Sequence, residues 1–125
     1  MIVAIGVDVV EISRLEEVFA RRGERFIKRV FTAAEISYCE RRASRFASFA
    51  ARFAAKEAVM KALGTGWSNG IGWKDIEVVS GTNGAPTIQL HGSALERMRE
   101  IGATRALISL THSDRMAIAQ VVLDS

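Results

Sequence analysis

The sequence predicts an α+β fold in which a largely antiparallel sheet packs against helices. The expected elements run in the order one strand, three helices, two strands, one helix and two strands, without the regular alternation of strand and helix that is typical of a parallel sheet. The chain has 125 residues, of which 49% are hydrophobic, so it can form one hydrophobic core but is too short for two ordinary domains. We therefore expect residues 1–125 to form a single domain.

A strand and a helix are expected at the start of the chain. Residues 2–10 are almost wholly aliphatic and rich in valine and isoleucine, which is typical of a buried strand. Ser13 and Glu16 have the spacing of a capping box, in which two side chains satisfy the first free amides of a helix. We expect this helix to run to about Arg22, before Gly23.

The next helix has a stronger start signal. Thr32 and Glu35 form a second capping box, and Phe31 and Ile36 occupy the positions of a hydrophobic staple across it. We expect the helix to continue to about Arg42.

Two more helices are expected further along the chain. The segment 46–63 predicts a long helix, because Gly64 directly after it can adopt the left-handed conformation that ends many helices. A shorter helix is expected at 95–101, where Ser93 and Glu96 have the spacing of a third capping box.

The remaining strands are expected to form two antiparallel pairs. Residues 76–79 and 87–90 are joined by the segment 80–86, whose glycine, asparagine and proline residues favour a turn, so these strands should form a hairpin. Residues 106–110 and 116–123 predict a second pair.

Composition excludes several classes of protein. Cys39 is the only cysteine, which rules out an internal disulfide and argues against a zinc site built from thiolates. No apolar run approaches the length of a membrane-spanning helix, and the apolar start of the chain lacks the basic segment of a signal peptide. We therefore expect a cytoplasmic protein that begins at Met1 and makes no membrane contact.

The net charge of +3 is unevenly distributed. Between Arg14 and Arg45 the chain has nine lysine or arginine residues against five aspartate or glutamate residues. This segment is a candidate docking surface for an acidic partner, although a solvated helix face would explain the charge equally well.

Two carboxylates interrupt the hydrophobic pattern. Asp8 is the only charged residue among the first ten, and strand alternation places it on the face that carries Ala4 and Val10. Glu57 lies within the apolar stripe of its helix, in line with Phe53. A buried carboxylate is costly unless it is paired or bound to a metal, so both residues should have partners.

Two interpretations of these carboxylates remain open. Lys61 lies one helical turn after Glu57, so the two could form an internal ion pair while backbone amides satisfy Asp8. Alternatively, Asp8 and Glu57 together supply the hard oxygen ligands that Mg²⁺ prefers. Lys61, Arg52 and the glycine-containing loop 64–66 would then suit a polyphosphate substrate, although this loop is not a Walker motif.

Two long motifs stand out in the sequence: residues 6–14, GVDVVEISR, and residues 52–66, RFAAKEAVMKALGTG. Shorter segments of note are residues 31–35, 83–86 and 109–113. Through these motifs the chain resembles, over nearly its whole length, the bacterial holo-acyl-carrier-protein synthases of the 4′-phosphopantetheinyl transferase superfamily.

The resemblance implies an activity and a set of site residues. Asp8 and Glu57 would bind Mg²⁺, which also contacts the pyrophosphate of coenzyme A. A serine hydroxyl of acyl carrier protein would attack the phosphorus nearest the pantetheine, 3′,5′-ADP would leave, and the holo-carrier protein would serve fatty acid biosynthesis. Lys61 would act on the substrate phosphate. By the same matching, the further coenzyme A contacts are Arg52, Gly64, Thr65, Gly66, Pro86 and His112. For His112, ordering a turn through hydrogen bonds is an alternative role.

The resemblance also implies partners. Members of the family are typically trimers with active sites between subunits, so His112 and Pro86 would face a neighbouring subunit's carboxylates. Acyl carrier proteins are acidic, and their docking falls on the helix after the first strand. The arginines assigned to that helix are Arg14, Arg21, Arg22 and Arg25.

Two other functions use the same features of the sequence. A small basic RNA-binding domain would explain the arginine content, but single-strand RNA readers usually present aromatic residues on strands, and all six phenylalanines here fall in or beside expected helices. A Mg²⁺-dependent phosphodiester hydrolase would use the same two carboxylates with water as nucleophile. We expect no nucleic acid partner.

Overall fold

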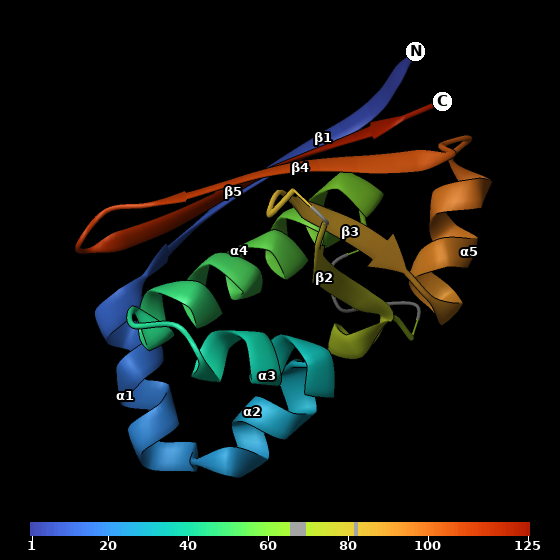
Figure 1. Ribbon diagram of the computed structural model, residues 1–125. Helices are drawn as coiled ribbons and strands as arrows, with labels where there is room; N and C mark the ends of the chain where they lie inside the picture. The colour runs from blue at the N-terminus through green and yellow to red at the C-terminus, as the bar shows by residue number, and fades with distance from the viewer. Residues whose placement is uncertain (66–69, 82) are drawn as a thin grey trace.

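The computed structural model describes residues 1–65, 70–81 and 83–125, and it confirms the α+β class (Figure 1). The strands are β1 (Ile2–Glu11), β2 (Ile76–Ser80), β3 (Pro86–Leu90), β4 (Arg105–His112) and β5 (Met116–Asp124). The helices are α1 (Ile12–Arg22), α2 (Glu24–Val30), α3 (Ala33–Glu40), α4 (Arg45–Leu63), the short 3-10 helix η1 (Trp73–Asp75) and α5 (Gly92–Glu100).

The helix α4 lies in the middle of the molecule. A three-stranded antiparallel sheet with the order β1-β5-β4 covers one side of α4, and the helices α1, α2 and α3 lie on the opposite side (Figure 1). The antiparallel hairpin β2–β3 and the helix α5 lie beside the C-terminal half of α4. Both expected strand pairs are therefore confirmed.

The two faces of the three-stranded sheet differ in exposure. On β5, alternate residues such as Ala119 and Val121 are fully buried against α4. On β1, the outward residues Ile5, Val7 and Val9 remain about half exposed or more. The sheet thus presents apolar side chains on both faces, although α4 covers only one of them.

The approach of β1 to α4 depends on a glycine. A Cβ atom added to Gly6 would lie 2.0 Å from the carbonyl oxygen of Ala58, a contact that no side chain can make. Ala54 and Ala58 are fully buried on the facing side of α4. Small residues on both elements therefore set the spacing between β1 and α4.

Helix starts were predicted with mixed success. The capping box at Thr32 is confirmed, because the Glu35 amide donates to the Thr32 hydroxyl at 3.2 Å and the Thr32 amide donates to the Glu35 carboxylate at 2.9 Å. The capping box at Ser13 is wrong: α1 begins at Ile12, whose amide donates to the Arg115 carbonyl at 2.9 Å. The one at Ser93 is also wrong, since α5 begins earlier and has no side-chain cap.

Other differences concern lengths and one missing element. The helix α2 was not expected, and it follows α1 after a break at Gly23, whose φ is +63°. The helix α3 ends at Glu40, two residues before the expected end. The end of α4 is confirmed, because Gly64 adopts the left-handed conformation with φ 76° and ψ 12°.

Within the described residues, every helix is too short or too polar to cross a membrane.

Candidate functional site

Asp8 and Glu57 line one cavity of about 400 Å³ on the side of the molecule where β1 meets α1. Asp8 lies on β1, opposite Ala119 of β5, and its side chain is 15% exposed. Glu57 lies near the middle of α4 and is half-buried. The close packing of β1 on α4 brings the two carboxylates, 49 positions apart in the chain, to the same opening.

The two carboxylates influence one another. Burial raises the pKa of Glu57 above its ordinary value, the negative charge of Asp8 raises this pKa further, and the charge of Lys61 lowers it. Among the described residues, Glu57 forms no ion pair. Its negative charge is therefore held in a partly desolvated position beside a second negative charge.

Lys61 pairs with Asp8 and not with Glu57. Its Nζ lies 2.8 Å from Oδ1 of Asp8 and donates to the Val7 carbonyl at 3.1 Å. The hydrogen bond to Asp8 raises the pKa of Lys61. The interpretation that Glu57 and Lys61 form an internal ion pair, with Asp8 held by backbone amides, is thus wrong. The Lys61 side chain is 57% exposed, so it remains accessible from solvent while it pairs with Asp8.

The chemistry of this donor set fits a magnesium ion. Mg²⁺ is usually bound by one or two carboxylates and keeps its other positions for water and substrate phosphates. Asp8 and Glu57 are two such carboxylates in an open cavity, and a divalent cation would offset both the burial and the repulsion by Asp8 that raise the pKa of Glu57. No group of three or more histidine, cysteine, aspartate or glutamate residues that could hold a metal occurs in the described part of the chain.

Arg52, Pro86 and His112 line a second, smaller cavity of about 180 Å³, to which Tyr38 and Arg42 also contribute. This cavity lies on a different side of α4. Arg52 and Glu57 are five residues apart on one helix, which corresponds to a rotation of about 140° around its axis. Within one copy of the chain, the structure therefore does not bring Arg52, Pro86 and His112 to the two carboxylates.

The glycine-containing loop follows α4 directly. Gly64 caps the helix, and its amide donates to the carbonyls of Met60 and Lys61 at 3.1 Å. Thr65 comes next in the chain, and Gly66 lies outside the described residues. Since Lys61 is in the last turn of α4, the start of this loop lies near the end of the helix that carries Glu57.

The four candidate docking arginines fall into two groups. Arg14 lines the cavity of Asp8 and Glu57. The other three, together with Phe26 and Arg29, line a cavity of about 420 Å³ at the far end of α1. These three are Arg21, Arg22 and Arg25. Arg25 was expected on the first helix but lies on α2, because Gly23 separates the two helices. Arg29, which was not among the expected docking arginines, also lies on α2.

A fully buried ion pair was also overlooked. Lys56, directly before Glu57, is fully buried, and its Nζ lies 2.8 Å from Oε1 of Glu35. The other oxygen of Glu35 accepts a hydrogen bond of 2.8 Å from the Val78 amide, and Lys56 also donates to the Trp73 carbonyl at 3.1 Å. This network joins α3, α4 and β2 behind the helix face that carries Glu57.

Comparison with known proteins gives a consistent result. The family model of the 4′-phosphopantetheinyl transferase superfamily matches residues 4–118. A holo-[acyl-carrier-protein] synthase of Solibacter usitatus is 46% identical over 125 residues, which is 100% of both chains. The crystal structure of the holo-[acyl-carrier-protein] synthase of Neisseria meningitidis matches with a TM-score of 0.89 and 30% identity over 100% of each chain. The Helicobacter pylori synthase in complex with coenzyme A matches with a TM-score of 0.84 and 32% identity, over 96% of this chain and 99% of that one.

Proposed function

Because this chain belongs to the 4′-phosphopantetheinyl transferase superfamily, we propose that it transfers the 4′-phosphopantetheine group of coenzyme A to a serine hydroxyl of acyl carrier protein. The serine oxygen forms a bond to the phosphorus nearest the pantetheine, and the bond from this phosphorus to 3′,5′-ADP breaks. The hydroxyl proton is released. The observation that carries the proposal is the convergence of Asp8 and Glu57 at one cavity, with Lys61 paired to Asp8.

The proposed roles follow from the charges of these residues. Asp8 and Glu57 hold Mg²⁺, which supplies positive charge next to the pyrophosphate when it is bound. Lys61, on the same helix as Glu57, donates hydrogen bonds to a phosphate oxygen as the bond to the leaving group lengthens. Phe53 and Phe26 form apolar walls of the cavity beside the two carboxylates.

Mass spectrometry of acyl carrier protein tests the proposal directly. Apo-carrier protein incubated with coenzyme A, Mg²⁺ and this protein should gain the mass of one phosphopantetheine group, and removal of the metal with a chelator should stop the gain. Hydrolysis of coenzyme A without a change in the carrier protein would instead support the hydrolase. None of the six phenylalanines lies on a strand, so the sheet lacks the phenylalanine platform of a typical RNA reader.

Replacing Lys61 with methionine is expected to reduce the rate of transfer by about a hundredfold or more, because the change keeps the aliphatic stem and removes the charge from the phosphate. Mg²⁺ binding, measured by calorimetry, should be largely kept. The matched control is Lys74→Met, which changes an exposed lysine outside the cavity. A normal rate combined with a lower melting temperature would mean that Lys61 serves only to neutralise Asp8.

We also propose that the active protein is a homotrimer in which each active site lies between two subunits. The exposed apolar side chains on the outer face of the sheet support this, since burial against another copy would remove them from water. These residues are Ile5, Val7, Val9, Leu107 and Ile118. The rotation of about 140° between Arg52 and Glu57 supports it as well, because two adjacent subunits can bring residues from different sides of α4 to one coenzyme A molecule.

Mixing two inactive variants tests this arrangement. Glu57→Ala and Arg52→Gln should each lose most activity, but trimers refolded from an equal mixture should recover about a quarter of the sites, because random assembly pairs intact residues from neighbouring subunits. A mixture of Glu57→Ala and Asp8→Ala should recover nothing, since both residues belong to one subunit's cavity. Recovery in neither mixture, with a light-scattering mass of one chain, would contradict the assembly.

Reversing the charge of Arg21 and Arg25 together is expected to raise the Michaelis constant for acyl carrier protein about tenfold at low salt, because surface charges mainly govern the encounter with an acidic partner. The Michaelis constant for coenzyme A should stay near normal. In the unchanged protein, added salt should raise the constant for carrier protein, and the response of the variant should be flatter. Arg99→Glu on α5 is the matched control. Normal carrier-protein kinetics with weakened coenzyme A binding would assign these arginines to the nucleotide.

A further inference from the structure

Arg52 is a nearly buried cation that pairs with no carboxylate among the described residues. Its side chain is 5% exposed, and no described residue forms an ion pair with it. Its Nε is buried and has no hydrogen-bond partner among the described residues. The Nε of this guanidinium group has lost its hydration without gaining a carboxylate, which is costly unless something else stabilises the cation.

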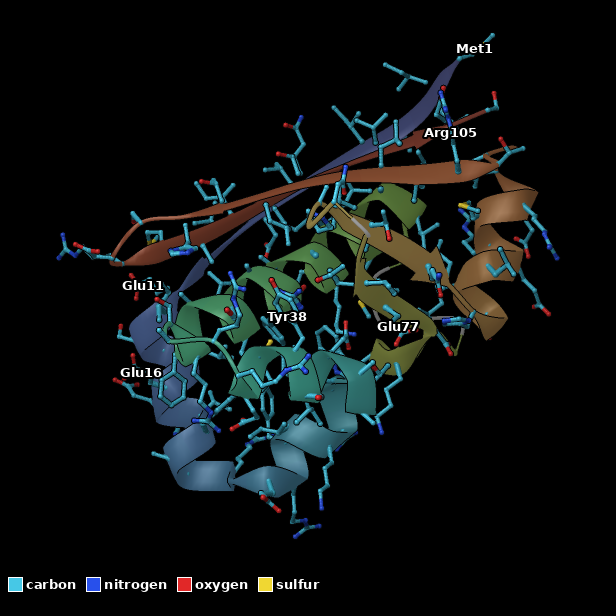
Figure 2. All side chains as sticks on the ribbon, in the orientation of Figure 1. Met1, Glu11, Glu16, Tyr38, Glu77 and Arg105 are labelled. Atoms are coloured by element: carbon cyan, nitrogen blue, oxygen red, sulfur yellow. The ribbon has the colours of Figure 1, made fainter. Side chains whose placement is uncertain are left out.

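An aromatic ring on α3 holds this guanidinium. The central carbon of the Arg52 guanidinium lies 4.0 Å from the centre of the Tyr38 ring, close enough for a strong cation–π contact. Arg42 lies 5.1 Å from the same ring centre. Figure 2 shows Tyr38 in the space between α3 and α4. Arg52 lies on α4. The contact with the Tyr38 ring therefore fixes the direction in which the guanidinium points into the smaller cavity.

Because Arg52 contacts a ring and not a carboxylate, its positive charge is not cancelled. A carboxylate would fix Arg52 equally well, but it would cancel its charge and repel an anion. An aromatic ring is neutral, so the guanidinium keeps its full positive charge and its N–H donors for a ligand. No aspartate or glutamate is among the residues described around this cavity, whereas Arg42 and His112 line it with Arg52.

We infer that Tyr38 is a positioning residue that holds Arg52 for the phosphate of coenzyme A that takes no part in the reaction. The inference rests on the proposed function. Coenzyme A carries a pyrophosphate, which that function assigns to Asp8, Glu57 and Lys61, and a separate phosphate on the 3′-oxygen of its ribose. The smaller cavity, with two arginines around one ring, has the charge and size for that single phosphate.

The test compares two variants of Tyr38 with three ligands: 3′,5′-ADP, coenzyme A and 3′-dephospho-coenzyme A. Tyr38→Phe keeps the ring and removes only the hydroxyl, whereas Tyr38→Leu removes the ring and keeps an apolar side chain. The affinity for 3′,5′-ADP, measured by calorimetry, should fall about five- to tenfold in Tyr38→Leu and stay within about twofold of normal in Tyr38→Phe. In transfer assays, Tyr38→Leu should raise the Michaelis constant for coenzyme A while leaving kcat near normal.

The same assays with 3′-dephospho-coenzyme A separate positioning from general stability. This ligand lacks only the ribose phosphate, so Tyr38→Leu should change its Michaelis constant little. Equal losses for both ligands, or equal losses in the phenylalanine and leucine variants, would overturn the inference. If the unchanged protein binds 3′,5′-ADP and modifies carrier protein while Tyr38→Leu binds 3′,5′-ADP as tightly, only the inference fails. If the unchanged protein does neither, the proposed function fails and the inference fails with it.

Discussion

Replacing Glu57 with glutamine is expected to reduce phosphopantetheine transfer by about a thousandfold or more while the protein remains folded. The change keeps the shape of the side chain and removes the charge that the proposed metal needs. Loss of Mg²⁺ binding, measured by calorimetry, should accompany the loss of transfer. Asp8→Asn should behave in the same way, and Glu16→Gln, at an exposed position on α1, is the matched control. Near-normal turnover in either site variant would contradict the metal assignment.

The same variant should be more stable than the unchanged protein at neutral pH. The pKa of Glu57 is raised above its ordinary value of 4.5, so the folded protein binds a proton there more readily than the unfolded chain does. This preference stabilises the fold below pH 4.5 and is lost as the pH rises through the raised pKa. Glutamine cannot ionise, so its advantage in melting temperature should appear at neutral pH and shrink as the pH falls toward 4.5. A lower melting temperature at neutral pH would mean that the charge of Glu57 is already compensated.

Replacing Lys56 with methionine is expected to lower the free energy of unfolding by about 3–5 kcal/mol, because it leaves the carboxylate of Glu35 buried without its cation. The change is similar in volume, so it creates little empty space. Denaturant unfolding followed by circular dichroism measures the loss. Exposed Lys28→Met removes the weaker surface pair with Glu24 and is the matched control, for which we expect less than about 1 kcal/mol.

A double variant distinguishes the ion pair from simple packing. Glu35→Leu combined with Lys56→Met removes both charges, so it should recover part of the stability that either single change loses. The recovery should be incomplete, because Glu35 also accepts hydrogen bonds from the Thr32 and Val78 amides. If the double variant loses the sum of the two single losses, the buried charges do not interact as proposed.

The features predicted correctly from the sequence are those that depend on neighbouring residues or on a broken pattern. The capping box at Thr32 and the left-handed end of α4 at Gly64 were predicted because local hydrogen bonds determine them. Asp8 and Glu57 were selected because a charge in an apolar pattern is costly without a partner; they line one cavity, and their role as metal ligands stays a prediction. The capping boxes at Ser13 and Ser93 failed, since two polar residues three apart are common and tertiary contacts decide where a helix begins.

The buried ion pair shows why part of the site region was missed. Lys56 shares one face of α4 with Phe49 and Leu63, seven residues before and after it, and all three are buried. The reasoning applied to Glu57 therefore applied more strongly to Lys56. Glu57, next to Lys56 in the chain, was interpreted as a candidate metal ligand, and Glu35 was already explained by its capping role. Its second role requires β2, which is 43 residues away in the chain and which no local pattern connects to it.

The contact between Gly6 and α4 also determines how freely the site can vary. A larger residue in a core can often be accommodated when a neighbouring side chain becomes smaller, so the two positions change together. At Gly6 the obstacle is the backbone carbonyl of Ala58. This carbonyl is present whichever amino acid occupies position 58. No substitution elsewhere can make room for a methyl group, so the position has no partner with which to compensate. A library that varies the residues around Asp8 and Glu57 should therefore keep this glycine fixed, because any side chain there would force β1 and α4 apart.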